Sequence, residues 1–420
     1  MNTKPLSIAA AVLAALAMSA CGEKPAEPKG AAPAAAAQEK PAAAAAPAAA
    51  QKCKSAEEIR ALVKSTDKAT PDEYFAVLEN YACCPVNQET LSIDDDTCAA
   101  EQVRVELREK GKLPGFETVL DRVLAHSAPQ VRARGYDALS GNLFGSTESD
   151  REAGKKALAT ETDLFALRAL IEGLRNEGNR VPEVGEFLKK MATHEHPALR
   201  RVATNALARS HSDKVPGVVE AVIARLGDED KEVVSIACKG ASTLGSDAIV
   251  EPIAAILKDA SKANIHTECV SALTDLWLDF PKRERTSAAA YKATLDYYKT
   301  TPRSQDVPDS GAVSALAGGY SIPRAGTKAA SEEKFVAWKK KASYYKPDEL
   351  AAIMLDIVKD PQANWMARGQ AVRVIGDAGG LAALKKIAST VEALNDDKAN
   401  LIKQGYEKEL KKAEEETAAK

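Results

Sequence analysis

Cysteine is the residue type in this chain whose number and spacing first suggest chemistry. Cys53, Cys83, Cys84 and Cys98 lie close together, and four thiols can form two disulfides or bind one metal ion. None of them has the Cys-x-x-Cys spacing of a structural zinc site. We therefore predict two disulfides, in which Cys53 and Cys98 each bond to one of the adjacent pair, in either of two pairings.

Histidine offers a second candidate site. The segment His194-Glu195-His196 has the residue types of a metal site. His194, however, precedes a proline by three residues, as His126 does elsewhere in the chain. Both residues are therefore interpreted as part of a turn before a helix, and we predict no metal ligand here.

Known catalytic motifs are incomplete or absent. Two Ser-x-x-Lys segments, at 65–68 and 331–334, match the first element of a penicillin-binding or β-lactamase site. The Ser-Asp-Asn and Lys-Thr-Gly elements that such a site also needs do not occur. Phosphate loops, nucleophile elbows, His-Glu-x-x-His and dinucleotide fingerprints are missing as well. We predict no catalytic residue, no cofactor and no enzyme activity.

Composition limits the remaining classes. The chain has 420 residues, enough for two or three domains or for one long repeat array, and its formal net charge is −3. Such a balance of charge gives no field that would attract nucleic acid. We therefore expect no nucleic-acid partner.

The first 51 residues have the features of a segment that directs export of a protein and anchors it to a membrane. The apolar run from 6 to 18 is too short to span a bilayer, which needs about 20 residues. It ends in Met18-Ser19-Ala20-Cys21-Gly22, which resembles the lipobox of bacterial lipoproteins. The resemblance implies a signal peptide over 1–20 and acyl chains on Cys21 that anchor the protein in a bilayer.

The residues after Cys21 extend this interpretation. Residues 21–51 are rich in Ala and Pro and contain no aromatic residue, a composition that predicts a disordered tether. Gly22 stands where an Asp would retain a lipoprotein in the inner membrane. The resemblance thus implies a lipid-anchored protein that faces the periplasm, at the outer membrane rather than the inner.

A repeated pattern dominates the body of the chain. Copies begin at 131, 199, 233, 265 and 367, with spacings of 68, 34, 32 and 102 residues, each close to a multiple of 34. A weaker copy is expected near 165. Positions 1 and 9 of the pattern are large, while positions 5 and 8 are mostly small, which lets neighbouring helices approach closely. Self-similarity at this period predicts a solenoid.

The copies resemble HEAT-like repeats. Val131-Arg132 and Leu199-Arg200 place an Arg at position 2, and each patterned helix follows an apolar helix and a polar turn. The resemblance implies an all-α fold, an armadillo-type α-solenoid of HEAT-like helix pairs, with repeats over 119–275 and a last repeat over 366–390. Second helices normally line the concave side of such arrays, where they bind protein ligands. The candidate binding residues on them are Arg132, Arg134, Arg201, Lys239 and Arg373.

Two further cysteines fall on consecutive second helices. Cys238 is at position 6 of its copy and Cys269 at position 5. Helix axes in such packing are about 8–10 Å apart, beyond easy reach of a disulfide between unmatched positions. We therefore predict buried free thiols.

Three regions lie outside the pattern. The sequence predicts a Cys-rich helical cap over 52–118 and an aromatic-rich irregular helical region over 276–365. It predicts a charged C-terminal helix or tail over 391–420. The stripes of aromatic residues in 276–365 are interpreted mainly as core. A basic run beside them suggests a binding patch for an acidic partner or for the membrane surface. The candidate residues of this patch are Trp338, Lys339, Lys340, Lys341 and Tyr344.

These features together favour a membrane-anchored scaffold or adaptor in the bacterial cell envelope, with an envelope protein as partner. Two alternatives stay open: a periplasmic module that binds a small ligand or metal, and an enzyme with its site in 276–365.

Overall fold

The computed structural model divides the chain into two units, 1–51 and 52–420. It describes residues 53–139, 148–175, 181–209, 215–279, 282–301, 303, 310–317, 322–325 and 327–418. The predicted signal peptide, the lipidation site Cys21 and the tether lie outside the described residues.

A small cap precedes the repeats. It contains α1 (Ala56–Arg60), α2 (Pro71–Glu79), η1 (Asn80–Cys83), α3 (Ala99–Glu109) and a hairpin of β1 (Val86–Asn87) with β2 (Ser92–Ile93), in which Val86 faces Ile93. Disulfides join Cys53 to Cys83 and Cys84 to Cys98, which is one of the two predicted pairings. The cap has a hydrophobic cluster of its own around residues such as Val77, Tyr81 and Val103.

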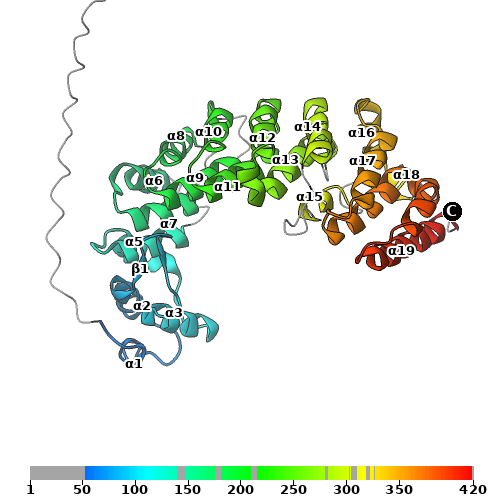
Figure 1. The fold of residues 1–420 in the computed structure, drawn as a ribbon. Helices are drawn as coiled ribbons and strands as arrows, with labels where there is room; N and C mark the ends of the chain where they lie inside the picture. The colour runs from blue at the N-terminus through cyan, green and yellow to red at the C-terminus, as the bar shows by residue number, and fades with distance from the viewer. Residues whose placement is uncertain are drawn as a thin grey trace, which may run out of the picture. The chain divides into compact units, whose positions relative to one another are not determined.

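The rest of the described chain consists mainly of helix pairs arranged in two rows (Figure 1). The first helices of the pairs are α4 (Leu120–Leu124), α6 (Glu148–Thr160), α8 (Pro182–Met191), α10 (Val218–Arg225), α12 (Val250–Leu257), α14 (Ala288–Thr300) and α17 (Pro347–Lys359). The second helices are α5 (Pro129–Ala138), α7 (Leu164–Leu174), α9 (Pro197–Arg209), α11 (Lys231–Leu244), α13 (His266–Leu278), α15 (Ser310–Ser314) and α18 (Trp365–Glu392). Each second helix packs on the second helix of the next pair, so the predicted α-solenoid is confirmed.

Small residues set the spacing of the second row. Gly240 of α11 lies so close to α9 that a Cβ atom there would meet the Cβ of Ala208 at 2.0 Å. Ala203 and Ala206 of α9 and Ala237 of α11 are buried as well. The small positions of the repeat pattern therefore allow the close approach that the sequence predicts.

The region 276–365 contains one further pair and an insertion. α14 and α15 continue the array between α13 and α18, so the 102-residue gap in the pattern hides a single second helix. After α15 come η6 (Ala329–Ser331) and α16 (Glu333–Lys341), and then α17. The last pair thus begins inside the region that the sequence suggested was irregular, at Pro347.

The C-terminal segment folds onto the last pair. α18 is kinked at Gly380, whose φ is +65° and whose added Cβ would meet the carbonyl oxygen of Ala325 at 2.8 Å. α19 (Ala399–Ala418) packs on α18 and buries Ile402 and Tyr406. The charged tail therefore includes a packed helix. The remaining short helices of the described residues are η2 (Phe116–Thr118), η4 (Asp247–Ile249) and η5 (Ala260–Ile265).

The prediction of free thiols at Cys238 and Cys269 is wrong, because the two residues form a disulfide between α11 and α13. Their Cα atoms are 4.7 Å apart and both side chains are fully buried. The estimate from helix axes failed because Cys238 and Cys269 lie where the two helices face each other, next to the small residues Ala237, Ala241 and Ala272. At such a contact the backbones come closer than the axes.

No helix in the part of the chain described here combines the length and the apolar character that crossing a membrane requires.

Thiol labelling tests this pairing. The full chain carrying Cys21→Ser, denatured without reductant, is expected to label at no cysteine, because its six remaining cysteines form three disulfides. Mass spectrometry after alkylation measures this, and the reduced protein serves as the fully labelled control. Labels on Cys238 and Cys269 alone would contradict the buried disulfide.

Candidate functional site

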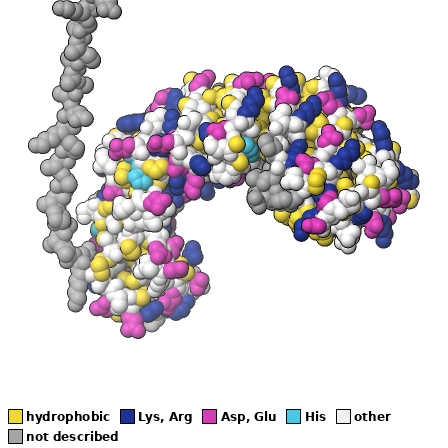
Figure 2. All heavy atoms as spheres, viewed as in Figure 1, with side chains coloured by type: hydrophobic (Ala, Val, Ile, Leu, Met, Phe, Trp, Pro, Cys, Tyr) yellow, Lys and Arg dark blue, Asp and Glu magenta, His cyan; other side chains and the backbone are white. Residues whose placement is uncertain are grey.

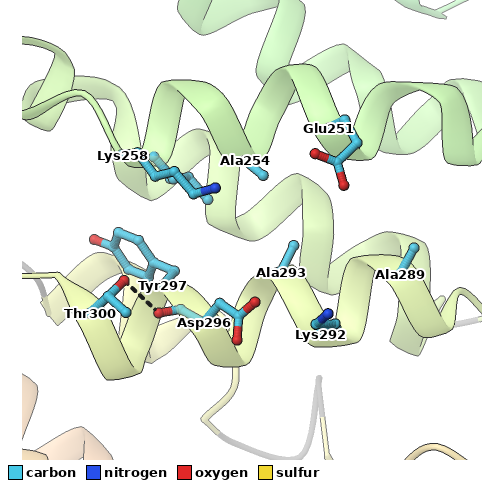
Figure 3. Close-up of a pocket in the computed structure, with 10 residues that line it drawn as sticks. Glu251, Ala254, Lys258, Ala289, Lys292, Ala293, Asp296, Tyr297 and Thr300 are labelled. Carbon is cyan, nitrogen blue, oxygen red and sulfur yellow. Dashed lines mark hydrogen bonds between the residues drawn. The ribbon is translucent and has the colours of Figure 1, made fainter.

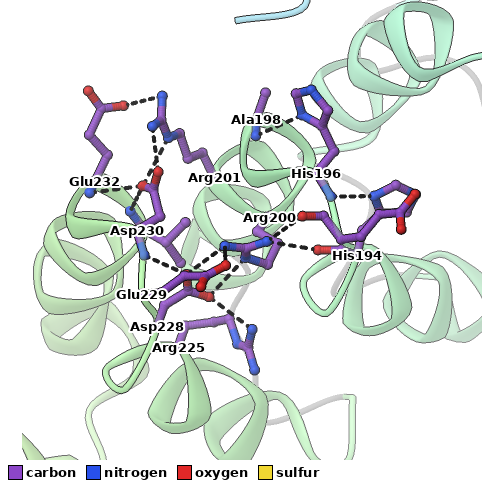
Figure 4. Close-up of polar contacts among 12 residues, drawn as sticks. His194, His196, Ala198, Arg200, Arg201, Arg225, Asp228, Glu229, Asp230 and Glu232 are labelled. Carbon is purple, nitrogen blue, oxygen red and sulfur yellow. Dashed lines mark hydrogen bonds and ion pairs between the residues drawn. The ribbon is translucent and has the colours of Figure 1, made fainter. Parts of the chain in front are cut away.

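A buried or partly buried arginine connects each of three second helices to the next turn along the chain. Arg200, near the start of α9, donates two hydrogen bonds to the carboxylate of Asp228, from Nε at 3.0 Å and from Nη2 at 2.9 Å. Its Nη1 donates to the carbonyl oxygens of His194 and Glu195 in the turn of its own pair, at 3.1 and 2.7 Å (Figure 4). One side chain therefore ties its own turn to the turn of the next pair.

Arg132 on α5 makes the same contacts. It donates to both carboxylate oxygens of Glu161 at 2.8 and 2.9 Å, and to the carbonyl oxygens of His126 and Ser127. The acidic partner again lies in the turn before the next second helix. The contact therefore recurs from one repeat to another.

Arg368 on α18 is the most deeply buried member, with none of its surface exposed. It donates to the carbonyl oxygen of Val358 at 2.9 Å and to both carboxylate oxygens of Asp396 at 2.8 Å. In all three cases the acid follows the arginine by 28 or 29 residues. That spacing is visible in the sequence, and our sequence analysis missed it.

Four of the seven second helices have no such bridge, and two of these, α11 and α13, carry clear copies of the sequence pattern. α13 has His266, whose Nε2 lies 3.2 Å from the carbonyl oxygens of Ile256 and Asp259, so the imidazole satisfies the turn without reaching the next repeat. α11 has Val234, which makes no such contact. The disulfide between Cys238 and Cys269 links α11 to α13 at this junction, so a covalent bond holds the two repeats together where the arginine is missing.

Hydrogen bonds favour the ionised form of two of the bridging acids, Asp396 and Glu161. Hydrogen bonds from Arg368 lower the pKa of Asp396 to about 2. Burial alone would raise the pKa of Glu161, but the hydrogen bonds from Arg132 and from the Asp163 backbone bring it below its usual value. Paired, buried charges of this kind hold structure together and are not available to bind a substrate.

The predicted binding residues on the second helices are paired within the chain. Arg201 forms ion pairs with Asp230 and Glu232, both at 2.6 Å. The other ion pairs are Arg132 with Glu161, Arg134 with Asp95, Glu101 and Asp137, Lys239 with Glu268, and Arg373 with Asp377. Their charges are thus largely neutralised by neighbouring residues.

The His194-Glu195-His196 segment is the turn between α8 and α9. The Nδ1 atom of His194 accepts a hydrogen bond from the backbone of His196, and Nδ1 of His196 accepts one from the backbone of Ala198. Nε2 of His196 lies 3.0 Å from the carbonyl oxygen of Gln88 in the cap hairpin. Burial lowers the pKa of His194. Within the described ranges, no group of His, Cys, Asp and Glu side chains has the arrangement of a metal site.

Trp338 was predicted to belong to a surface patch, and this prediction is wrong. Its side chain is fully buried, and Nε1 donates to the carbonyl oxygen of Trp277 at 3.1 Å. Tyr344 is half-buried and donates to the same carbonyl oxygen at 2.7 Å. These two hydrogen bonds attach the segment between α15 and α17 to α13. Tyr291 and Tyr345 belong to the aromatic cluster that packs around them.

The basic part of the patch is exposed. Lys339, Lys340 and Lys341 form the last turn of α16, and none of them makes an ion pair with a described residue. Val336, one turn earlier, is 39% exposed. We call these four residues the α16 basic face. They differ from the arginines of the second helices in having charges that no neighbour neutralises.

The fold and its turn contacts define this chain as an α-solenoid of HEAT-like helix pairs. Residues 184–274, from α8 to α13, match the family model described as HEAT repeats. No curated protein matches the chain.

Among solved structures, an engineered protein is 17% identical with a TM-score of 0.37, over 85% of this chain and 98% of that one. Kap121p is 14% identical with a TM-score of 0.40, and the match covers 81% of this chain but 33% of Kap121p. Similarities this low support no argument about function.

The arginine bridge can be tested at its most buried member. Arg368→Met is expected to lower the free energy of unfolding by about 3 kcal/mol, because it leaves a carboxylate and a carbonyl group without their donor. Arg168→Met is the matched control, since it removes a half-exposed pair within α7 and should cost about 0.5 kcal/mol. Urea denaturation measures both, and equal losses would contradict a special role for the buried bridge.

Proposed function

We propose that this protein is a lipid-anchored solenoid scaffold of the bacterial cell envelope. In this proposal, acyl chains on Cys21 hold it at a membrane, facing the periplasm, and the glycine at position 22 favours the outer membrane over the inner. The solenoid binds an envelope protein and performs no catalysis.

The disulfides support an envelope location. All six cysteines of the described residues are paired, and disulfides persist in the periplasm and other oxidising compartments but are rare in the cytosol. The lipobox-like segment that ends in Cys21 is the independent sequence argument. Together they favour export followed by lipid attachment.

The continuous array of helix pairs carries the scaffold proposal. Packed second helices, two arginine bridges and one disulfide fix neighbouring repeats against each other, and a third bridge connects the last pair to the turn before α19. Solenoids of this kind present long surfaces on which proteins bind. The HEAT-repeat match over 184–274 supports the same class.

The α16 basic face is the surface that we propose for the partner. Its three lysines have no described ion-pair partner, whereas Arg201 and the bridging arginines do. An acidic protein surface would neutralise them and cover Val336. The neighbouring rings of Phe335 and Trp338 point inward, and this favours a protein over a membrane, because membrane-surface helices place aromatic residues at the interface.

Lipidation is tested at Cys21. The substitution Cys21→Ser is expected to shift the protein from the membrane fraction to the soluble periplasmic fraction and to abolish labelling by a fatty-acid analogue, because the acylated thiol is lost. Lys54→Ser, at an exposed position, serves as the control that retains Cys21 and leaves the three disulfides intact. A Cys21→Ser protein that stays on the membrane would contradict the lipid anchor.

Partner binding is tested by photocrosslinking in cells. A photoreactive residue at Ala337 is expected to give one dominant protein adduct, and Lys339→Glu with Lys340→Glu and Lys341→Glu should reduce it about tenfold, because like charges repel an acidic partner. Reversing Lys408, Lys411 and Lys412 on α19 is the matched control. An adduct that survives the charge reversal on α16 would contradict an acidic protein partner at this face. A reversal that changes only liposome binding would contradict it as well.

A further inference from the structure

An open groove runs between two neighbouring first helices, α12 and α14. It encloses about 430 Å³. Three alanines, Ala254, Ala289 and Ala293, lie along it (Figure 3). Because alanine side chains are short, another backbone could approach these helices closely at the centre of the groove.

Four charged side chains stand around the alanines in an alternating order. Glu251 and Lys258 lie at opposite ends of the α12 wall (Figure 3), about 10 Å apart along the helix at 1.5 Å per residue. On the α14 wall, Lys292 lies toward the end of Glu251, and Asp296 lies toward the end of Lys258. Each end of the groove therefore has one positive and one negative group, in reversed order at the two ends.

None of these four groups forms an ion pair with a described residue. Elsewhere on the same layer opposite charges do meet, as Lys299 of α14 and Glu349 of α17 do at 3.1 Å. The charges at the groove are thus exposed and available to an incoming surface.

An alternating arrangement of this kind is complementary to itself. A twofold rotation about the groove direction places α12 opposite α14 of a second copy. Glu251 then faces the second copy's lysine at 292, and Lys258 faces its aspartate at 296. A twofold axis across the groove also places each charge opposite one of the other sign. Isologous interfaces need this self-complementarity.

We propose that the face formed by α12 and α14 binds a second copy of this chain, as a twofold symmetric homodimer. The small alanines let the two helix pairs approach, and the four charges of each copy pair with those of the other. α12 has 8 residues and α14 has 13, lengths of about 12 and 20 Å. Such a face is smaller than the interfaces of permanent dimers, so the dimer is weak and sensitive to salt.

This surface is separate in sequence from the α16 basic face, so the homodimer does not depend on the proposed acidic partner. A chain that fails to dimerise can still give the partner adduct, and the reverse also holds. The two proposals therefore fail independently.

Cysteine crosslinking tests the symmetric contact directly. In the full chain with Cys21→Ser, the six remaining cysteines are paired, so Ala293→Cys adds the single free thiol. Residues near a twofold axis approach their own copies, and this variant is therefore expected to form a disulfide-linked dimer under mild oxidation. Ala255→Cys, which is exposed on α12 but does not line the groove, is the control. Equal dimer yields from the two variants would overturn the proposal.

Charge reversal provides the second test. Lys258→Glu with Lys292→Glu makes an all-acidic groove, and Glu251→Lys with Asp296→Lys makes an all-basic one. Each variant alone, carrying Ala293→Cys, is expected to lose dimer about tenfold through like-charge repulsion, whereas a mixture of the two should form the mixed dimer. Circular dichroism confirms that each variant is folded, since all four side chains are exposed. A mixture that crosslinks no better than its components would overturn the proposal.

Discussion

The structure depends on a buried arginine that belongs to two repeats at once. Its guanidinium group donates to carbonyl groups in the turn between the two helices of its own pair, and it also pairs with a carboxylate in the next turn. Hydrophobic packing alone would let one helix pair slide or tilt against another, because it has no directional preference. The bidentate arginine contact has a defined geometry and therefore fixes the relative position of neighbouring pairs.

A disulfide replaces the arginine bridge at one junction of the array. At the junction of α11 and α13 the valine at position 234 cannot bridge, and the disulfide between Cys238 and Cys269 connects the same two repeats. His266 on α13 still contacts carbonyl oxygens that precede its own helix, but it does not reach the next repeat. The two disulfides of the cap join residues within it, before the first pair, where the protein has a small separate core.

Surfaces whose charged side chains form no ion pair within the chain are the best candidates for binding. Most arginines of the second helices are neutralised within the chain, so they contribute to stability and give a partner little to bind. The α16 basic face and the groove between α12 and α14 differ in this respect. The first has charges of one sign and suits an acidic partner, whereas the second has balanced charges and suits a copy of itself. A scaffold with both would join a partner to a pair of chains.

The sequence by itself determined the helix pairs, their period and the two possible pairings of the cap cysteines, because these follow from residue types at short, regular spacings. It also indicated that the aromatic stripes of 276–365 are mainly core, since their residues recur at helical spacing, and Phe335, Trp338 and Tyr345 are indeed buried. Tertiary structure alone decided that Cys238 meets Cys269 and which pairing the cap adopts. Each of these depends on the direction in which a side chain leaves its helix and on the closeness of two backbones at one contact. Residue spacing along a chain contains neither quantity, because both arise only when separate helices pack against each other.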